Sequence, residues 1–280
     1  MHPFNKSAIT AYGDYLSHGL YTFHSGFEHI DNFVNQNGDF ISLADDVSFL
    51  APNSIIISDF MSGNYSQVVI GDDFAQINNQ KYILNKKLQQ NSSFIYPAIA
   101  YSTLVDKINA FINMQASDFP PKSLFFLLHP ENNINFTSAF EKAFMQQLNY
   151  AYSLFSTQLY ESIKAFKSRG SGLTPSGDDF IAGVLFGLDF LEKTTGISFN
   201  KMKNNIYEIG KSNNIFSNNM LRMAYHAKYF KRLQDFLNAF FYLPLGNISP
   251  AFKQLIAVGD TSGADLLTGF LVVIMKRSVQ

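Results

Sequence analysis

A phrase of ten residues occurs twice in this chain of 280 residues. Residues 174–183 read TPSGDDFIAG, and residues 260–269 read DTSGADLLTG. Both copies contain Ser-Gly-x-Asp, two apolar residues, one small residue and a glycine, and both continue into an apolar stretch. Ser followed by Asp three residues later is a variant of the capping box that begins a helix. The repeat therefore predicts two helices that begin in the same way.

The loop before the first copy allows two positions for the N-cap. Gly170 and Gly172 permit positive φ angles and the close approach of a ligand. Pro175 restricts Thr174 to an extended conformation. Thr174 can then be the N-cap, with Pro175 in the first helical position. Alternatively, Ser176 can be the N-cap, with the acidic residue three positions later closing the box.

The second copy favours the serine register. It lacks the proline but keeps Ser262 and Asp265, which correspond to Ser176 and Asp179. In this register Asp179 and Asp265 turn back to cap their own helices, so we expect a structural role for both. Helix caps are common, and most of them bind only their own backbone. The repetition raises the expectation of a function.

The predicted function of the two helix starts is to bind an anion. A helix N-terminus that follows a glycine-rich loop presents backbone N–H groups and the positive end of the helix dipole. Two such starts in one chain predict a single pocket formed from both. The expected substrate-binding residues are Arg169, Gly170, Gly172, Thr174, Ser176, Gly177, Asp178, Thr261, Ser262 and Gly263.

Asp178 is the best candidate for a catalytic residue. It has no equivalent in the second copy, where Ala264 stands, so it is freer than Asp179 to contact a ligand. Such a carboxylate can accept hydrogen bonds from a substrate amide, position an arginine, or help to hold a divalent cation. Arg169 is the nearest candidate for a fork that binds phosphate or carboxylate. No cofactor is expected otherwise.

Three glycines lie inside the predicted helices, at Gly183, Gly187 and Gly269. Glycine costs about 1 kcal/mol relative to alanine in a helix interior, so its presence there needs a reason. Close helix–helix contact is the simplest reason. We therefore expect the two helices to cross and to bring their N-termini together.

The hydrophobic period changes near Pro97. Before it, β-rich runs alternate with turn signals such as Asn37-Gly38 and Asn78-Asn79. After it, apolar residues recur at helical spacing. This pattern is longest over residues 137–166 and is followed by shorter stretches near 201–212, 217–228 and 231–242.

This change of period predicts an α+β protein. We expect an N-terminal antiparallel β-sheet or partly closed barrel over residues 1–95. A mainly α-helical region over residues 96–280 would carry both Ser-Gly-x-Asp motifs. No low-complexity linker separates the two parts, so we expect them to pack as one unit.

Composition excludes several classes of protein. Hydrophobic residues make up 46% of the chain, which is enough for a packed core and argues against disorder. The absence of cysteine excludes disulfides, thiolate nucleophiles and cysteine-based metal sites. A net charge of −1 from scattered residues is unlike a nucleic-acid-binding protein. Without a signal peptide or a membrane-length apolar run, a cytoplasmic protein with no membrane partner is expected.

At residues 170–183, GSGLTPSGDDFIAG, the chain resembles the AllH-like family, a subunit family of oxamate carbamoyltransferase. The stretches 215–221 and 259–265 are similar to later landmarks of that family. The resemblance implies phosphorolysis of oxalurate to oxamate and carbamoyl phosphate at the end of allantoin catabolism, with other carbamoyltransferase subunits as partners. The alternatives are a non-catalytic scaffold or regulatory subunit, and a small-anion-binding protein without turnover.

Overall fold

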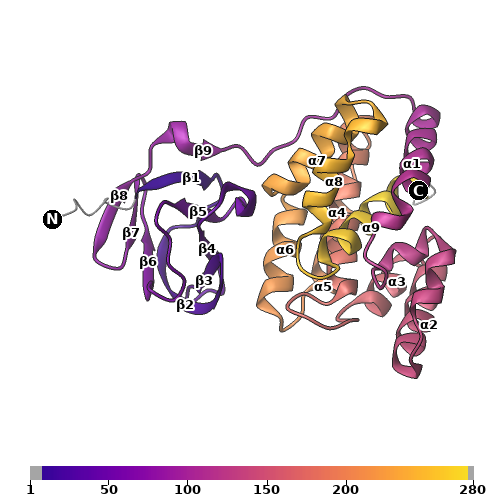
Figure 1. Cartoon of the computed structure of the whole chain (residues 1–280), viewed down its shortest axis with the longest axis horizontal. Helices are drawn as coiled ribbons and strands as arrows, with labels where there is room; N and C mark the ends of the chain where they lie inside the picture. The colour runs from indigo at the N-terminus through magenta and orange to yellow at the C-terminus, as the bar shows by residue number, and fades with distance from the viewer. Residues whose placement is uncertain (1–7, 277–280) are drawn as a thin grey trace. The chain divides into compact units, whose positions relative to one another are not determined.

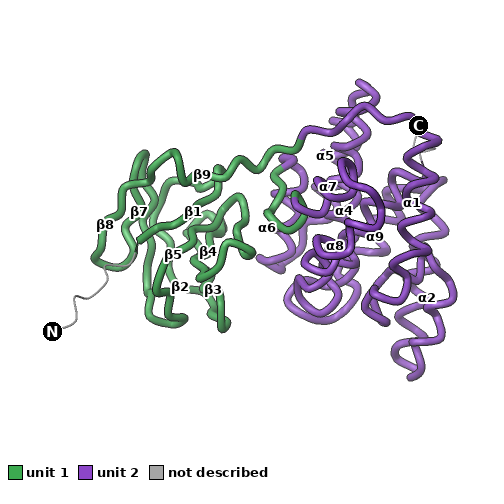
Figure 2. Tube along the Cα trace, turned by 45° about the horizontal axis from the view of Figure 1, so that its top comes forward, with its two compact units in different colours: residues 1–94, 228–234 green, residues 95–227, 235–280 purple. Residues whose placement is uncertain are grey.

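The structure is a computed structural model that describes residues 8–276, and it confirms the α+β class. The chain divides into two compact units (Figure 2). The strand-rich unit comprises the described residues up to Phe94 and also the segment Lys228–Gln234, while the helical unit contains the rest. The sequence pattern did not predict that this later segment belongs to the strand-rich unit.

Over its described residues, the strand-rich unit is a curled sheet of nine strands (Figure 1). Neighbouring strands follow the order β8-β7-β6-β2-β3-β4-β5-β1-β9. The pairs β4–β5 and β1–β9 are parallel and the other pairs are antiparallel. The strands are β1 (Ile9–Gly13), β2 (Gly19–Phe27), β3 (Ile30–Val34), β4 (Phe40–Ala44), β5 (Ser54–Ile57), β6 (Gln67–Ile70), β7 (Phe74–Ile77), β8 (Gln80–Ile83) and β9 (Gln89–Gln90).

Both predicted turns join neighbouring strands of this sheet. Gly38 has a φ of 78° between β3 and β4, and Asn78 has a φ of 50° between β7 and β8. Glycine and asparagine tolerate this left-handed region better than other residues. Buried side chains such as Tyr21, Phe33 and Ile55 form the core of the curled sheet.

The helical unit contains nine α-helices within the described residues, except that the first four residues of α7 belong to the strand-rich unit. Short 3-10 helices lie between some of them; the one that matters below is η4 (Leu124–Leu127). The α-helices are α1 (Tyr101–Gln115), α2 (Ala139–Ser153), α3 (Leu159–Phe166), α4 (Ser176–Thr195), α5 (Asn200–Gly210), α6 (Ile215–Tyr225), α7 (Lys231–Tyr242), α8 (Ser249–Ile256) and α9 (Ser262–Met275).

The long amphipathic pattern over residues 137–166 forms two helices rather than one. Helix α2 ends at Ser153 and α3 begins at Leu159. The Ser162 hydroxyl of α3 donates to the Ala151 carbonyl of α2 at 2.7 Å. The turn between the two helices contains Phe155, which is buried and packs edge to face against the Phe180 ring. Tertiary packing of this aromatic side chain therefore overrides a continuous helical period.

Helices α4 and α9 form the centre of the helical unit. Every residue from Ser176 to Leu191 and from Gly263 to Ile274 is buried. A helix that is apolar on nearly all sides must be covered on all sides, and α4 packs against α3, α5, α6 and α9. Both repeated motifs therefore open helices that lie in the core.

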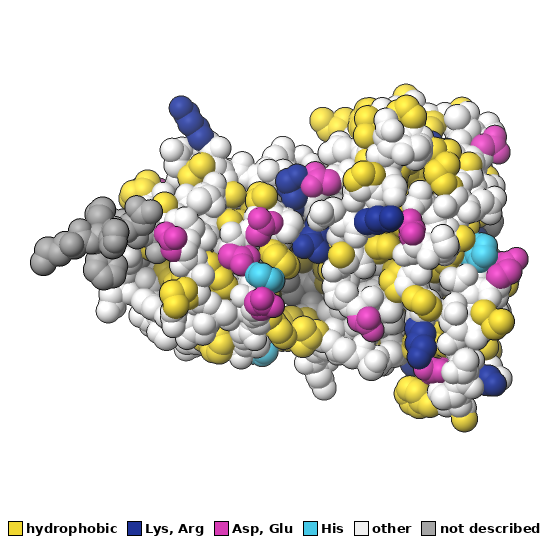
Figure 3. Space-filling view, viewed as in Figure 1, with side chains coloured by type: hydrophobic (Ala, Val, Ile, Leu, Met, Phe, Trp, Pro, Cys, Tyr) yellow, Lys and Arg dark blue, Asp and Glu magenta, His cyan; other side chains and the backbone are white. Residues whose placement is uncertain are grey.

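None of the helices in residues 8–276 is both long and apolar enough to cross a membrane. On the face drawn in Figure 3, acidic and basic side chains lie apart or in mixed groups.

Candidate functional site

The helices α4 and α9 cross at their glycines, as predicted. A Cβ atom at Gly183 would lie under 3.0 Å from the carbonyl oxygen of Leu266, and one at Gly269 would lie under 3.0 Å from that of Phe180. Phe180 and Leu266 occupy the same position in the two copies of the phrase. The contact is therefore reciprocal, and the two helices are related by an approximate two-fold axis at their crossing.

The crossing brings the two motifs together, which confirms the prediction that they meet. The hydroxyl oxygens of Thr174 and Ser262 are 2.9 Å apart, within hydrogen-bonding distance. The hydroxyl oxygens of Ser176 and Thr261 lie 3.5 Å apart on the other side of the crossing. Each motif thus touches the other through one threonine and one serine.

The predicted cap register needs correction. Pro175 and Thr261 are the N-cap residues, so Ser176 and Ser262 are the first residues of their helices, and neither N-cap side chain accepts a capping hydrogen bond. The backbone before each helix replaces the expected cap. Consequently the serine hydroxyls are directed to the facing motif instead of to their own helix.

Backbone carbonyls of the same loops already accept hydrogen bonds from two of the amides expected to bind an anion. The Gly177 N–H donates to the Arg169 carbonyl at 2.8 Å, and the Gly263 N–H donates to the Val258 carbonyl at 3.1 Å. Helix amides that already have backbone partners are not available to a ligand. An anion at this place therefore has to use other groups of the loop.

Asp179 and Asp265 do not cap their helices either. The Thr174 hydroxyl donates to Asp179 Oδ2 at 2.9 Å, and the Thr261 hydroxyl donates to Asp265 Oδ2 at 2.7 Å. Asp265 Oδ1 also accepts the Leu124 N–H of η4 at 2.6 Å. The two aspartates are equivalent members of one hydrogen-bonded cluster at the crossing.

Burial shifts the protonation of this aspartate pair. Desolvation raises the pKa of Asp265 to about 7, although the Leu124 amide and the Thr261 hydroxyl favour its charged form. Desolvation also raises the pKa of Asp179 well above its usual value, and the charge of Asp265 raises it further. Two carboxylates in one dry site disfavour double ionisation.

Asp178 is buried rather than free, which corrects the expectation from the sequence. Its Oδ1 accepts the Ser168 N–H at 2.6 Å, and Ser168 has a φ of 57°. Its Oδ2 and the Ser217 hydroxyl oxygen are both buried without a hydrogen-bond partner within the described residues. Burial raises the pKa of Asp178, while the Ser168 amide and the nearby Ser217 hydroxyl oppose this shift. Ser217 favours the carboxylate without reaching hydrogen-bond geometry.

The glycine-rich loop is exposed around this buried cluster. Arg169 is exposed, and its Nε donates to the Ala165 carbonyl at 3.3 Å. Gly170 and Gly172 have φ angles of 115° and 103°. A Cβ at Gly170 would lie 2.7 Å from the Ser176 amide nitrogen, whereas one at Gly172 would meet the Thr174 carbonyl oxygen at 3.9 Å, an ordinary van der Waals contact.

One residue of the site was missed in the sequence. The Asn214 side chain caps α6 by accepting the N–H groups of Phe216 and Ser217, and its Nδ2 donates to the Leu173 carbonyl at 2.7 Å. Asn214 therefore ties the glycine-rich loop to the start of a third helix. An asparagine before a helical period is a recognisable cap signal, but the contact with Leu173 is visible only in three dimensions.

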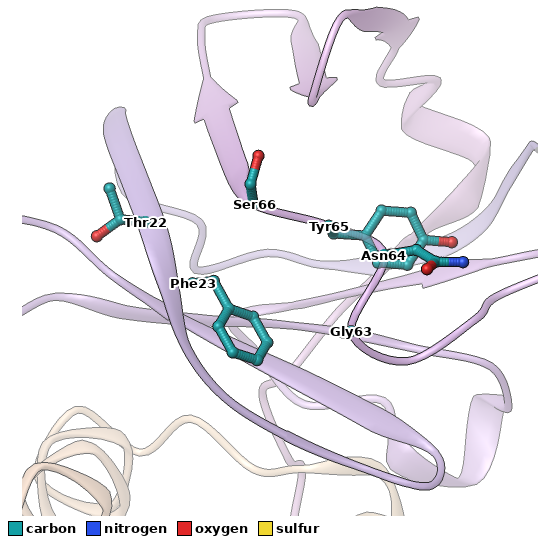
Figure 4. A pocket seen from close by; sticks show the side chains of 6 residues that line it. All are labelled: Thr22, Phe23, Gly63, Asn64, Tyr65 and Ser66. Atoms are coloured by element: carbon teal, nitrogen blue, oxygen red, sulfur yellow. The ribbon is translucent and has the colours of Figure 1, made fainter.

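A separate hollow lies in the strand-rich unit (Figure 4). None of its lining residues belongs to either motif. No group of three or more His, Asp or Glu side chains within residues 8–276 is placed to hold a metal ion. The hollow is lined by Thr22, Phe23, Gly63, Asn64, Tyr65 and Ser66.

Comparison with known proteins bears on the helical unit alone. No curated protein and no solved structure matches the chain. A family model does match, and its range contains both motifs, the aspartate pair, Asp178 and Asn214. The resemblance found in the sequence is thereby confirmed over this range: residues 168–274 match the family described as oxamate carbamoyltransferase subunit AllH.

Proposed function

We propose that the chain is a subunit of an oxamate carbamoyltransferase-type enzyme, which converts oxalurate and phosphate to oxamate and carbamoyl phosphate. The observation that carries the proposal is the meeting of the two motifs, joined by the 2.9 Å contact of Thr174 with Ser262 inside the matched range. The substrates and products are small anions, and carbamoyl transfer depends mainly on positioning and charge stabilisation.

The exposed side of the glycine-rich loop is the proposed anion site. The amides of Gly177 and Gly263 are already paired, whereas Arg169 and Gly172 are exposed. An arginine fork suits phosphate and carboxylate. The partly buried hydroxyls of Thr174, Ser176, Thr261 and Ser262 would then hold the loop in its conformation rather than contact the anion.

Asp178 is proposed to act on the carbamoyl group. Its Oδ2 has no hydrogen-bond partner within the described residues, and an unpaired buried carboxylate oxygen favours a hydrogen-bond donor such as the NH₂ of a carbamoyl group. Its other oxygen holds the Ser168 amide, so the carboxylate is fixed in position. Movement of the exposed loop is required for a ligand to reach it.

The test is an assay of carbamoyl phosphate formation from oxalurate and phosphate, with and without the other subunits of the enzyme. Arg169→Gln should raise the KM for phosphate or oxalurate at least about tenfold, because a charge-assisted hydrogen bond is worth roughly 1.5–3 kcal/mol. The melting temperature should not change, since the side chain is exposed. Lys164→Gln on α3, which removes an exposed lysine paired with Glu161, is the matched control. Unchanged kinetics in Arg169→Gln would place the anion elsewhere.

A second candidate is a docking subunit without catalytic groups, and one surface favours it. Helix α2 exposes 82% of Phe140 and 63% of Tyr150. With Ala143 and Gln147 these side chains form one helical stripe without a charge. Protein interfaces are enriched in aromatic residues and depleted of charges at their centre. The word subunit in the family description indicates another subunit of the same enzyme as the occupant.

Phe140→Glu should weaken the complex with that subunit at least about tenfold, because an aromatic anchor at an interface contributes roughly 2 kcal/mol or more. Sedimentation velocity of the mixed purified subunits measures the change. Asn149→Glu, on the opposite flank of α2, introduces the same charge and should leave the complex intact. Equal weakening by both variants would argue against a specific stripe.

A further inference from the structure

Two carboxyl groups, those of Asp179 and Asp265, are buried at the helix crossing, where close packing of the helices does not require them. Asp179 and Asp265 have 1% and 0% of their surface exposed, although each could be replaced in a core by an apolar residue. Buried carboxyl groups are costly unless they are paired or protonated. No lysine or arginine forms an ion pair with either one in the described part of the chain. A bound proton is therefore the simplest compensation.

Hydroxyl groups from both motifs surround the two aspartates. The Thr174 hydroxyl donates to Asp179, and the Ser262 hydroxyl of the facing motif also favours the charged form of Asp179. The Thr261 hydroxyl likewise donates to Asp265, and the Ser176 hydroxyl of the facing motif also favours the charged form of Asp265. The hydroxyls thus supply each aspartate with a donor but leave it without a positive partner.

We propose that Asp179 and Asp265 form a proton-operated latch, in which a proton bound to the pair holds the loops 168–175 and 257–261 together and its loss releases them. Each aspartate binds the threonine of its own loop, and each threonine contacts the serine of the other helix. Two negative charges at this crossing would repel each other across the contacts that join the loops. The cost of the repulsion is relieved when the loops separate and water enters.

Neighbouring charges reinforce this behaviour. Asp178 acts on Asp179 and Asp260 acts on Asp265, and both raise the pKa of their neighbour. The basic groups of the surrounding elements have other partners or lie at helix ends. Lys167 after α3 lowers the pKa of Asp178 by its charge. Lys203 of α5 pairs with Glu192, and Lys253 of α8 pairs with Asp118. Lys107 of α1 donates to the Leu243 carbonyl, and Arg222 lies in the last turn of α6.

The latch would control the loop that carries Arg169, and only this consequence depends on the proposed function. The latch itself is a property of the protein without ligand. When the loops part and water enters the crossing, the Leu124 amide, which donates to Asp265, becomes accessible to exchange. The Gly177 and Gly263 amides donate within their own loops, to the Arg169 and Val258 carbonyls, so the parting of the loops leaves their partners in place. The Leu124 amide is therefore the reporter of the closed state, and the Gly177 and Gly263 amides are internal references.

Hydrogen exchange of the ligand-free full chain between pH 5 and pH 8, corrected for the intrinsic exchange rate, tests the latch. Protection of the Leu124 amide should fall by up to about tenfold per pH unit, because the closed state binds one more proton than the open state. Protection of the Gly177 and Gly263 amides should change less. Asp179→Asn and Asp265→Asn keep the hydrogen-bonding shape without the charge, so they should flatten this dependence. Asp260→Asn, which removes an exposed carboxylate of the same loop, should retain it.

Equal pH dependence in the wild-type chain and in both asparagine variants would overturn the proposal. Circular dichroism establishes that the variants are folded. If they are not, infrared spectroscopy of the wild-type chain decides, because a protonated buried carboxyl group has a carbonyl band distinct from that of a carboxylate. The latch predicts such a band that titrates near neutral pH, and its absence at pH 6 would contradict the latch. Neither readout depends on catalytic activity, so failure of the latch and failure of the proposed function are separable.

Discussion

Gly183→Ala is expected to unfold the helical unit or to destabilise it by more than about 4 kcal/mol. The added methyl group would lie under 3.0 Å from the Leu266 carbonyl oxygen, which belongs to the backbone of a buried helix and cannot move aside. Gly269→Ala should have a similar effect, because its methyl group meets the Phe180 carbonyl in the reciprocal position. Urea unfolding followed by circular dichroism measures both effects.

Two other glycines serve as comparisons for this prediction, one with less space for a methyl group than the other. A Cβ at Gly187, one turn along α4, would lie 3.0 Å from the Phe270 carbonyl oxygen and from Val273 Cβ, so Gly187→Ala should cost less. Gly246 has nothing within 4 Å of an added Cβ, and Gly246→Ala should change stability by no more than about 0.5 kcal/mol. A Gly183→Ala protein as stable as Gly246→Ala would refute the helix crossing.

Raising the pH from 5 to 8 should destabilise the helical unit, and Asp265→Asn should remove much of this loss. The folded-state pKa of Asp265 is about 7, against an ordinary value of 3.8. The folded chain therefore binds more protons than the unfolded chain between these values, and stability falls as the pH rises through this window. Between pH 5 and the folded-state pKa the loss amounts to roughly 3 kcal/mol, at about 1.4 kcal/mol per pH unit. Urea unfolding at a series of pH values measures the loss.

Other groups titrate in or near this range, so the difference between wild type and variant is the informative quantity. His29 has its pKa raised by Asp45 and contributes a loss of the same sign in the strand-rich unit. Glu141 has its pKa lowered to about 2 by Lys122 and the Ser138 amide, so its contribution is lost only as the pH falls below its ordinary value of 4.5. A wild-type chain and an Asp265→Asn chain with parallel pH profiles would show that Asp265 is ionised throughout.

Much of the site's arrangement was predictable because it depends on local signals. The Ser-Gly-x-Asp repeat predicted two similar helix starts, and the interior glycines predicted that the helices cross closely. Both predictions are confirmed by Gly183 and Gly269 at the crossing and by the contact of Thr174 with Ser262. Glycine inside a helix has few reasons to exist other than close contact. Glycines inside a predicted helix therefore indicate a tertiary contact from the sequence alone.

The roles of the three aspartates were not predictable, because they depend on which groups the crossing buries. Sequence spacing assigned Asp179 and Asp265 to capping, yet the loop backbone supplies the caps and the carboxyl groups face the hydroxyls at the crossing. Asp178 looked free because it is not repeated, but it lies buried beneath the turn at Ser168. Hydrogen-bond partners more than 80 positions apart, such as Thr174 and Ser262, cannot be read from spacing.

By itself, the sequence determined the α+β class, the two hairpin turns, most helices of the second part and the likeness to the AllH family. These follow from periodicity, turn residues and motif length, which act over a few neighbouring residues. Only the tertiary structure decided that the pattern over residues 137–166 breaks into two helices, that residues 228–234 belong to the strand-rich unit, and that the two motifs share a buried acidic cluster. Those outcomes depend on which side chains exclude water together, and only the folded chain brings those side chains into contact.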